Sequence, residues 1–300
     1  MKVAIIVFSP TGNTLKVGKM LEDQLNSKNV DVQLYNFTGN KKIFQKGEIK
    51  SFLKENIKEH DLLCIGSPVY AHHLHYNVKD LIKSLPKPEN GWAKLAVPFV
   101  TYGAINSGIA LHEAAKLLKK SGRITILGMK INGFHCMTAL PQIKVKINEG
   151  MPGNEAIPII EKLTNKIVQF NGTIIDKTTD ITKKLNYQKL KSRIKAKIIF
   201  REKFWHKHLY PTVTFNHNNC EKCGQCINIC PVNCIEMEEE GPILLDNPSC
   251  IHCGACILEC KYNAIEISAN WDRLNSILIK SINGQGPLVS NENPKSLVYS

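Results

Sequence analysis

The chain has 300 residues, 43% of them hydrophobic, which is enough to build the core of one large domain or of two ordinary ones. No apolar run approaches the roughly 20 residues that span a bilayer, and the run at residues 3–8 is too short for a signal peptide, so we expect a cytoplasmic protein that does not bind a membrane. The net charge of +13 is typical of proteins that bind acidic proteins or nucleic acid. No nucleic-acid-binding motif is present, so we expect no nucleic-acid partner.

The first half of the chain alternates between strand and helix patterns. Residues 2–8 form an apolar run typical of a buried parallel strand, and the apolar residues between Leu15 and Leu25 recur at helical spacing. Further strands are predicted at 30–37, 61–66, 95–101 and 123–131, and further helices at 49–58, 77–84, 109–120 and 154–170. This alternation predicts an α/β fold, a doubly wound parallel sheet of five strands with helices on both faces.

Ligands of such sheets bind in the loops after the carboxyl ends of the strands. The first of these loops, residues 9–14, offers the hydroxyls of Ser9, Thr11 and Thr14, a flexible Gly12 and the N-terminus of the next helix. It has no P-loop lysine, so it suits a phosphate that is held rather than transferred.

The motif Ser9-Pro-Thr-Gly-Asn-Thr14 resembles the first loop of the flavodoxin family, Ser/Thr-x-Thr-Gly-Asn-Thr. The resemblance covers residues 1–170 and implies that Ser9, Thr11, Gly12, Asn13 and Thr14 bind the phosphate of FMN. It also implies that two further loops embrace the isoalloxazine ring, through Ser67, Pro68, Val69, Tyr70, Ala71 and His72 and through Thr101, Tyr102, Gly103, Asn106 and Gly108. This domain has a net charge of +10, from 23 basic and 13 acidic side chains, whereas many flavodoxins are acidic.

Two features near these loops leave alternatives open. The long segment 132–153, with Cys136 and Met137, could cover the flavin or be a plain surface excursion. His72, His73 and His75 could contact the ring, face solvent or bind a metal.

Residues 171–213 form a basic linker that separates the two halves. Within it, residues 177–208 carry 11 basic and 2 acidic side chains, and the apolar Leu190, Ile194, Ile198, Phe204 and Trp205 recur at rough helical spacing. We expect a helix that packs its apolar stripe between two domains, and a helix on a membrane surface is the alternative.

Cysteines dominate the second half, where nine of the eleven lie between Cys220 and Cys260. Eight of them form two C-x2-C-x2-C-x3-C runs, an internal duplication that fits neither a disulfide framework nor the paired C-x-x-C units of a zinc site. The stretch 214–269 resembles the bacterial two-cluster ferredoxin domain, and it carries 2 basic and 8 acidic side chains. The resemblance implies two [4Fe-4S] clusters, one bound by Cys220, Cys223, Cys226 and Cys260 and the other by Cys250, Cys253, Cys256 and Cys230.

The other cysteines have simpler interpretations. Cys64 is expected in the core, and Cys234 is expected to pack against a cluster without binding iron. Cys136 is expected to be an ordinary side chain, with a reactive thiol as the alternative. The tail, residues 270–300, is expected to be irregular or to form a strap across another surface.

Together the two halves resemble the flavodoxin–ferredoxin fusion family of anaerobic bacteria and archaea. The resemblance implies electron transfer between two [4Fe-4S] clusters and FMN, with protein redox partners such as an acidic ferredoxin or a low-potential oxidoreductase. No G-x-G-x-x-G sequence occurs, so no site for NAD(P)H is predicted. A flavin-dependent reductase fed by the clusters, a redox-sensing subunit and a homodimer are open alternatives.

Overall fold

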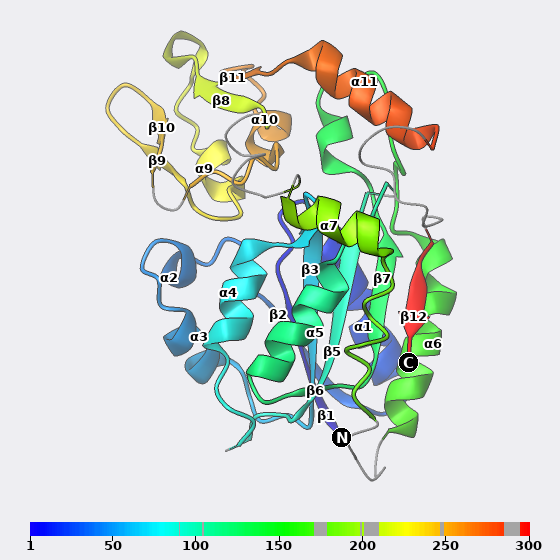
Figure 1. Cartoon of the computed structure of the whole chain (residues 1–300). Coiled ribbons are helices and arrows are strands. Elements are labelled where there is room, and N and C mark those ends of the chain that lie inside the picture. Colours follow the sequence, from blue (N-terminus) through cyan, green and yellow to red (C-terminus); the bar gives the residue numbers. More distant parts are fainter. Residues whose placement is uncertain are drawn as a thin grey trace.

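The computed structural model of the chain describes residues 1–89, 91–103, 105–170, 179–198, 200, 210–246, 249–284 and 295–300. A sheet flanked by helices forms the first half of the chain. A smaller module of short strands and helices lies at the carboxyl ends of the sheet strands, and it is coloured yellow to orange in Figure 1.

Five parallel strands run in the order β2-β1-β3-β5-β7, which confirms the predicted doubly wound sheet. They are β1 (Lys2–Val7), β2 (Asp31–Asn36), β3 (Leu62–Tyr70), β5 (Leu95–Tyr102) and β7 (Gly128–Asn132). The single strand predicted at 123–131 is wrong, because β6 (Ile124–Thr125) pairs with the start of β5 and the chain then steps to β7, which pairs with its end.

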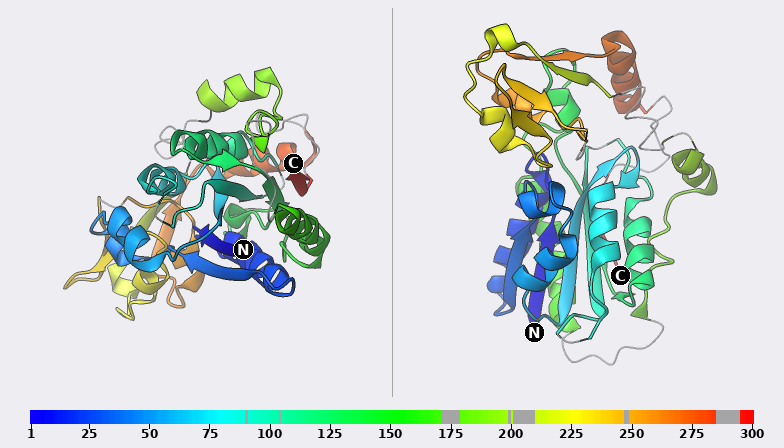
Figure 2. Two further views of the ribbon diagram at one scale, coloured as in Figure 1. Left: turned by 90° about the horizontal axis from the view of Figure 1, so that it is seen from below. Right: turned by 90° about the vertical axis from the view of Figure 1, so that its left-hand side faces the viewer.

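Helices cover both faces of the sheet, as Figure 2 shows in its end-on view. Val3, Ile5 and Val7 of β1 pack with α1 (Asn13–Asn26) and α6 (Ile157–Gln169). The alternate residues Ala4 and Ile6 point to the other face, which packs with α3 (Ile49–Asn56), α4 (Tyr76–Ser84) and α5 (Ala110–Lys120). Short turns of helix are α2 (Lys41–Phe44), η1 (Cys136–Ala139) and η2 (Asn154–Ala156).

Strand β3 is longer than predicted. Residues 67–70, expected in a loop, continue the strand and form a hairpin with β4 (His73–Leu74). The two turn residues, Ala71 and His72, have φ values of 44° and 69°, as a tight hairpin turn requires. The apolar run ends at Gly66, so the sequence pattern did not reveal this extension.

The cysteine module repeats itself with a shift of 30 residues, visible in the pairs Cys220 and Cys250 or Cys230 and Cys260. Its elements are β8 (Thr212–Phe215), η4 (His217–Asn219), α9 (Gln225–Ile229), β9 (Ile235–Met237), β10 (Pro242–Leu244), α10 (Ala255–Glu259) and β11 (Ile265–Ser268). Strand β8 of the first half pairs with β11 of the second, and β9 of the first pairs with β10 of the second. Each half therefore completes its sheet with a strand of the other.

The linker contains α7 (Leu190–Ile198), and here the predicted packing is wrong. Leu190, Ile194 and Ile198 are 66%, 47% and 63% exposed, whereas Ala196 on the opposite side is buried. Phe204 and Trp205 lie outside the described residues. None of the helices in the described ranges is long and apolar enough to cross a membrane.

The tail is more regular than expected, because α11 (Trp271–Ile282) and β12 (Leu297–Tyr299) lie within it. The side chain of Asn270 caps α11 by accepting a hydrogen bond from the Arg273 amide. Leu274 and Leu278 pack on Leu140 and Ile147 of the long segment after β7. Strand β12 adds antiparallel to the edge strand β7.

Candidate functional site

The loop between β1 and α1 presents backbone donors at a helix N-terminus. Gly12 has a φ of 85° and precedes the helix, and the N–H groups of Thr11, Asn13 and Thr14 make no hydrogen bond within the described part of the chain. Three orphan donors at the positive end of a helix dipole fit a phosphate.

The polar side chains of this loop mostly hold its shape. Ser9 Oγ accepts a hydrogen bond from the Leu15 amide at 2.8 Å, and Asn13 Nδ2 donates to the Phe134 carbonyl at 2.9 Å. Thr14 and Thr101 are both buried, and their hydroxyl oxygens are 2.8 Å apart. Thr101 therefore joins the phosphate loop to the end of β5.

Two neighbouring cavities lie above the carboxyl ends of β1, β3 and β5. The smaller, about 70 Å³, is lined by Ser9, Pro10, Thr11, Asn13, Thr14, Pro68, Thr101, Phe134 and six shared residues. The larger, about 140 Å³, adds Ala71, His72, Ile105, Asn106, Met137, Tyr210, His252, Leu274, Ile277 and Leu278. The shared residues are Val69, Tyr70, Tyr102, Gly103, His135 and Cys136. A ligand with a phosphate at one end and a flat apolar ring at the other could span both cavities.

Three of the predicted flavin residues line neither cavity, namely Gly12, Ser67 and Gly108. Ser67 is fully buried, where its hydroxyl donates to the Pro68 carbonyl and accepts from the His75 amide. Gly108 is needed for a close approach, because a Cβ there would lie 1.9 Å from the carbonyl oxygen of His72. Ser67 and Gly108 therefore determine the shape of the loops without lining either cavity.

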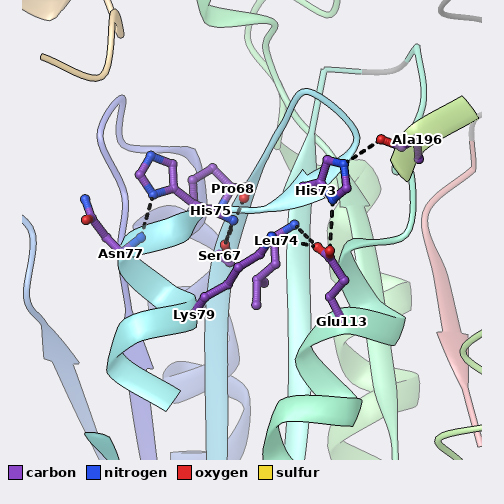
Figure 3. A network of polar contacts seen from close by, with 9 residues as sticks. All are labelled: Ser67, Pro68, His73, Leu74, His75, Asn77, Lys79, Glu113 and Ala196. Atoms are coloured by element: carbon purple, nitrogen blue, oxygen red, sulfur yellow. Dashed lines mark hydrogen bonds and ion pairs between the residues drawn. The ribbon is translucent and has the colours of Figure 1, made fainter. Parts of the chain in front are cut away.

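The three neighbouring histidines point in different directions (Figure 3). His73 Nδ1 lies 2.9 Å from Glu113 Oε1, and its Nε2 lies 2.9 Å from the Ala196 carbonyl of α7. His75 Nδ1 accepts a hydrogen bond from the Asn77 amide and so caps α4. His72 stacks on Phe200, with ring centroids 4.2 Å apart, and its pKa is lowered to about 3 by burial and by the nearby His73.

Glu113 is the centre of this network. Burial alone would raise its pKa, but the hydrogen bond and charge of His73, the charge of Lys79 and the Leu74 amide outweigh burial and lower the pKa. The ring of His73 thus lies between two oxygens, one of the Glu113 carboxylate and one of the Ala196 carbonyl.

The segment after β7 lines the cavities, as one of the two alternatives for residues 132–153 allowed, although the sequence did not single out His135. His135 and Cys136 line both cavities, and Met137 lines the larger one. Burial lowers the pKa of His135 to about 4 and raises that of the Cys136 thiol to about 11, so both are neutral at pH 7. The segment is held in place by α11, which covers it. Asn275 of α11 accepts a hydrogen bond from the Lys144 amide through Oδ1 and donates one to the Gln142 carbonyl through Nδ2.

Four of the cysteines lie around one cavity. Cys220, Cys223, Cys226 and Cys260, called the first group below, line this small cavity, and Cys223 is exposed. The other four predicted ligands, called the second group below, are Cys230, Cys250, Cys253 and Cys256, and they lie in or against one apolar core together with Cys226 and Cys234. Two iron–sulfur clusters and the assignment of their single ligands stay a prediction.

Backbone donors accompany the thiols. The amides of Lys222 and His252 donate to the sulfurs of Cys220 and Cys250, at 3.4 and 3.3 Å. Cys234 lies beside Cys230, with 3.5 Å between the sulfurs and its amide 3.3 Å from Cys230 Sγ. Hydrogen bonds to ligand sulfur are one of the means by which proteins set cluster potentials.

The second cysteine group and the larger cavity share a wall. His252, between Cys250 and Cys253, lines that cavity, and Cys136 is close enough to Cys253 to contribute to the rise in its pKa, which burial dominates. Leu140 lies against Gly254, where a Cβ would be 3.2 Å from Leu140 Cδ2. Cys230 and Cys253 also belong to the same apolar core as Phe8 and Phe37 of the sheet domain.

Two family models match the chain. One, described as NADPH-dependent FMN reductase, matches residues 1–130, and the other, described as a 4Fe-4S dicluster domain, matches residues 219–265. No curated protein matches the chain.

Several solved structures are similar to its first half. A flavodoxin from the domain Archaea is 19% identical, with a TM-score of 0.37 over 56% of this chain and 97% of that chain. Flavodoxin 1 from Bacillus cereus is 15% identical, with a TM-score of 0.40 over 56% of this chain and 98% of that chain. The apo form of the NADH:FMN oxidoreductase EMOB is 17% identical, with a TM-score of 0.42 over 60% of this chain and 93% of that chain.

Proposed function

Because the chain is a flavodoxin–ferredoxin fusion, with a flavodoxin-like FMN domain and a 4Fe-4S domain, we propose that it carries electrons between redox proteins through two [4Fe-4S] clusters and one FMN. The first cluster is held by Cys220, Cys223, Cys226 and Cys260, and the second by Cys250, Cys253, Cys256 and Cys230. The single observation that carries this proposal is that His252, which lies between Cys250 and Cys253 in the sequence, lines the larger cavity.

The geometry gives the two clusters different places in the relay. Cys223 of the first group is the one exposed cysteine among the eight predicted ligands, so the first cluster would be the one that an external protein can approach. The second group lies against the sheet domain, so the second cluster is the one next to the flavin. The order is then outer protein, first cluster, second cluster and FMN.

The chain's own residues position the flavin and keep water away from it. Amides of Thr11, Asn13 and Thr14 bind the phosphate, while Tyr70 and Tyr102 lie beside the ring. Leu274 and Leu278 of α11 close the larger cavity from above. Flavin accepts one or two electrons whereas a cluster accepts one, so the pair supplies chemistry that converts single electrons into pairs.

The relay predicts both composition and kinetics. Anaerobically purified protein should contain about eight iron, about eight acid-labile sulfide and about one FMN per chain. After a pulse of one-electron reductant, the flavin should be reduced in a first-order phase whose rate does not change with protein concentration. A rate proportional to protein concentration would mean that electrons pass only between molecules and would contradict the relay.

Two variants test whether electrons reach the flavin through the second cluster. Cys253→Ala should abolish the concentration-independent phase, because Cys253 is a predicted ligand of the cluster next to the flavin. Cys64→Ala is the matched control, since Cys64 is a fully buried cysteine inside β3, and it should leave the phase intact. Bound FMN and the iron content of both proteins are measured in parallel, so that a lost cluster is distinguished from a lost fold.

A second candidate, a flavin-dependent reductase, is favoured by one observation, the match of residues 1–130 to the NADPH-dependent FMN reductase family. It predicts that NADPH reduces the bound FMN directly, in the Cys253→Ala variant as well as in the wild type. If NADPH leaves the flavin oxidised while reduced clusters reduce it, the relay is retained alone.

A further inference from the structure

We propose that the outer face of α7 is the docking site of an acidic electron-carrier protein that exchanges electrons with the flavin. This face, called the α7 face below, consists of the exposed Lys189, Leu190, Lys191, Ile194, Lys197 and Ile198. The proposal rests on the proposed relay and names the partner at its flavin end.

The apolar part of the α7 face is unusual among the described residues. Leu190 and Ile198, at 66% and 63% exposed, are the two most exposed large apolar side chains in the described part of the chain, and Ile194 is 47% exposed. Their spacing of four residues places them on one side of the helix. An apolar centre with a charged rim is the usual composition of a protein-binding surface.

The charged part of the face has one sign. Residues 183–198 contain seven Lys and Arg and no Asp or Glu. Among the described residues, Asp180 pairs with Lys119 at 2.8 Å, and Glu113 pairs with His73 and Lys79. The face therefore attracts acidic proteins and repels basic ones.

The α7 face is fixed beside the flavin cavity. The Ala196 carbonyl on the inner side of α7 lies 2.9 Å from His73 Nε2, as Figure 3 shows, and the neighbouring His72 lines the larger cavity. Figures 1 and 2 show α7 along the side of the sheet domain, near the carboxyl ends of its strands. A protein bound there would be close to the flavin.

The α7 face is basic and the cluster module is acidic, and this contrast favours a separate acidic carrier as the partner of the α7 face. The cluster module has a net charge of −6, from 2 basic and 8 acidic side chains in residues 214–269, so it repels the carrier that α7 attracts. The carrier is thereby directed to the flavin and away from the first cluster. A membrane surface is a poorer fit, because three apolar side chains on a helix of nine residues bury little area.

The test uses the loaded full-length chain with two probes, an acidic bacterial [4Fe-4S] ferredoxin and the basic cytochrome c. The variant Lys189→Glu/Lys191→Glu/Lys197→Glu should slow electron exchange between the flavin and the ferredoxin by roughly tenfold at low salt. The loss should shrink as ionic strength rises, because salt screens the attraction. Exchange with cytochrome c should become faster.

The matched control is Lys46→Glu/Lys50→Glu/Lys54→Glu, three exposed lysines in and before α3, which Figure 1 shows away from α7, at the lower left. It changes the net charge equally and should alter the ferredoxin rate less than twofold. Equal slowing by both triple variants would show an effect of total charge and overturn the proposal. Ile194→Ser, which keeps all charges, should also weaken ferredoxin binding, and it decides the matter if the charge variant folds poorly.

A membrane or a second copy of the chain on the α7 face would each give a different result, and either result would overturn the proposal. Wild-type chain that binds phosphatidylglycerol vesicles through the α7 lysines would assign the face to a membrane, and a dimer that the α7 variant dissociates would assign it to a second copy. Failure of the relay is separate, since it would appear as loss of the intramolecular phase in the wild type. The α7 variant should keep that phase.

Discussion

The loop after β5 approaches the β3–β4 turn so closely that only glycine fits at position 108. Gly108 has a φ of 57°, and a Cβ there would lie 1.9 Å from the His72 carbonyl oxygen, which already accepts a hydrogen bond from the Ile109 amide. The sequence identified Gly108 as a flavin residue, and the structure shows that it acts on the shape of the two loops that the resemblance assigns to the ring.

Gly108→Ala should therefore reduce FMN affinity and the free energy of unfolding more than an ordinary substitution at a positive φ does. We expect at least tenfold weaker FMN binding, because the two loops must move apart, and a loss of stability greater than the roughly 1 kcal/mol of backbone strain alone. Gly47→Ala is the control, since Gly47 has a φ of 71° but nothing within 4 Å of its Cβ position. Flavin fluorescence titration and urea unfolding measure both effects, and equal results for the two variants would contradict the role of the close approach.

At the scale of elements, α7 is attached to the sheet domain through the β3–β4 hairpin. His73 connects the Ala196 carbonyl of α7 to the carboxylate of Glu113 on α5, and Glu113 also accepts from the Leu74 amide at 2.9 Å. The helix has no other buried residue than Ala196 among those described. Its position therefore depends strongly on this one polar network.

Glu113→Gln should loosen α7. Gln keeps only one of the two carboxylate oxygens that contact His73 and the Leu74 amide, so we expect a loss of about 1–2 kcal/mol in the local stability of the helix. Hydrogen exchange at the amides of residues 190–198 should become about tenfold faster. Lys79→Met, which removes the 3.2 Å ion pair to Glu113 but keeps His73, should have a smaller effect, and unchanged protection in Glu113→Gln would refute this account.

Across the whole molecule, the cluster module is connected to the sheet domain at both of its ends. The linker reaches it through α7, and the chain returns from it through α11 to β12, which pairs with β7 (Figure 1). Tyr299 of β12 stacks on Tyr187, with ring centroids 4.9 Å apart, and the Lys295 carbonyl accepts a hydrogen bond from the Tyr102 hydroxyl at 3.1 Å. The last segment, residues 295–300, thus supports the sheet edge through β12 and a residue of the larger cavity through Lys295.

Removal of residues 295–300 should affect both functions of this strand. The exposed edge of β7 should promote aggregation, and Tyr102 should lose its acceptor, so we expect a fall of several degrees in melting temperature and weaker FMN binding. Lys166→Ala, which removes only the exposed contact to Ser300, should change neither. Calorimetry and flavin titration give the answer, and a truncated chain as stable as the wild type would show that β12 is dispensable.

The sequence was sufficient wherever the information is local. Hydrophobic periodicity predicts most of the elements in residues 1–170. The spacing of the cysteines reveals two repeated runs, because each run lies within one short loop and helix, whereas the ligand sets that combine the two runs came from the resemblance to the two-cluster ferredoxin domain. The phosphate loop was predicted for the same reason, since its donors are consecutive residues. The missed hairpin β3–β4 and the missed helix α11 have patterns too short, or too rich in polar residues, to read locally.

Only the tertiary structure decided how the parts face one another. His135, His252 and Leu278 lie in three segments far apart in the sequence, yet they line one cavity, because α11 and the segment after β7 pack together over the sheet. The apolar stripe of α7 was expected to be buried and is exposed, since periodicity shows which residues share a face but not what covers it. The sequence thus predicted which cofactors the chain should hold, because their binding motifs are local, and the packing decided that His252 of the second cysteine run lines the same cavity as Tyr70 and Tyr102.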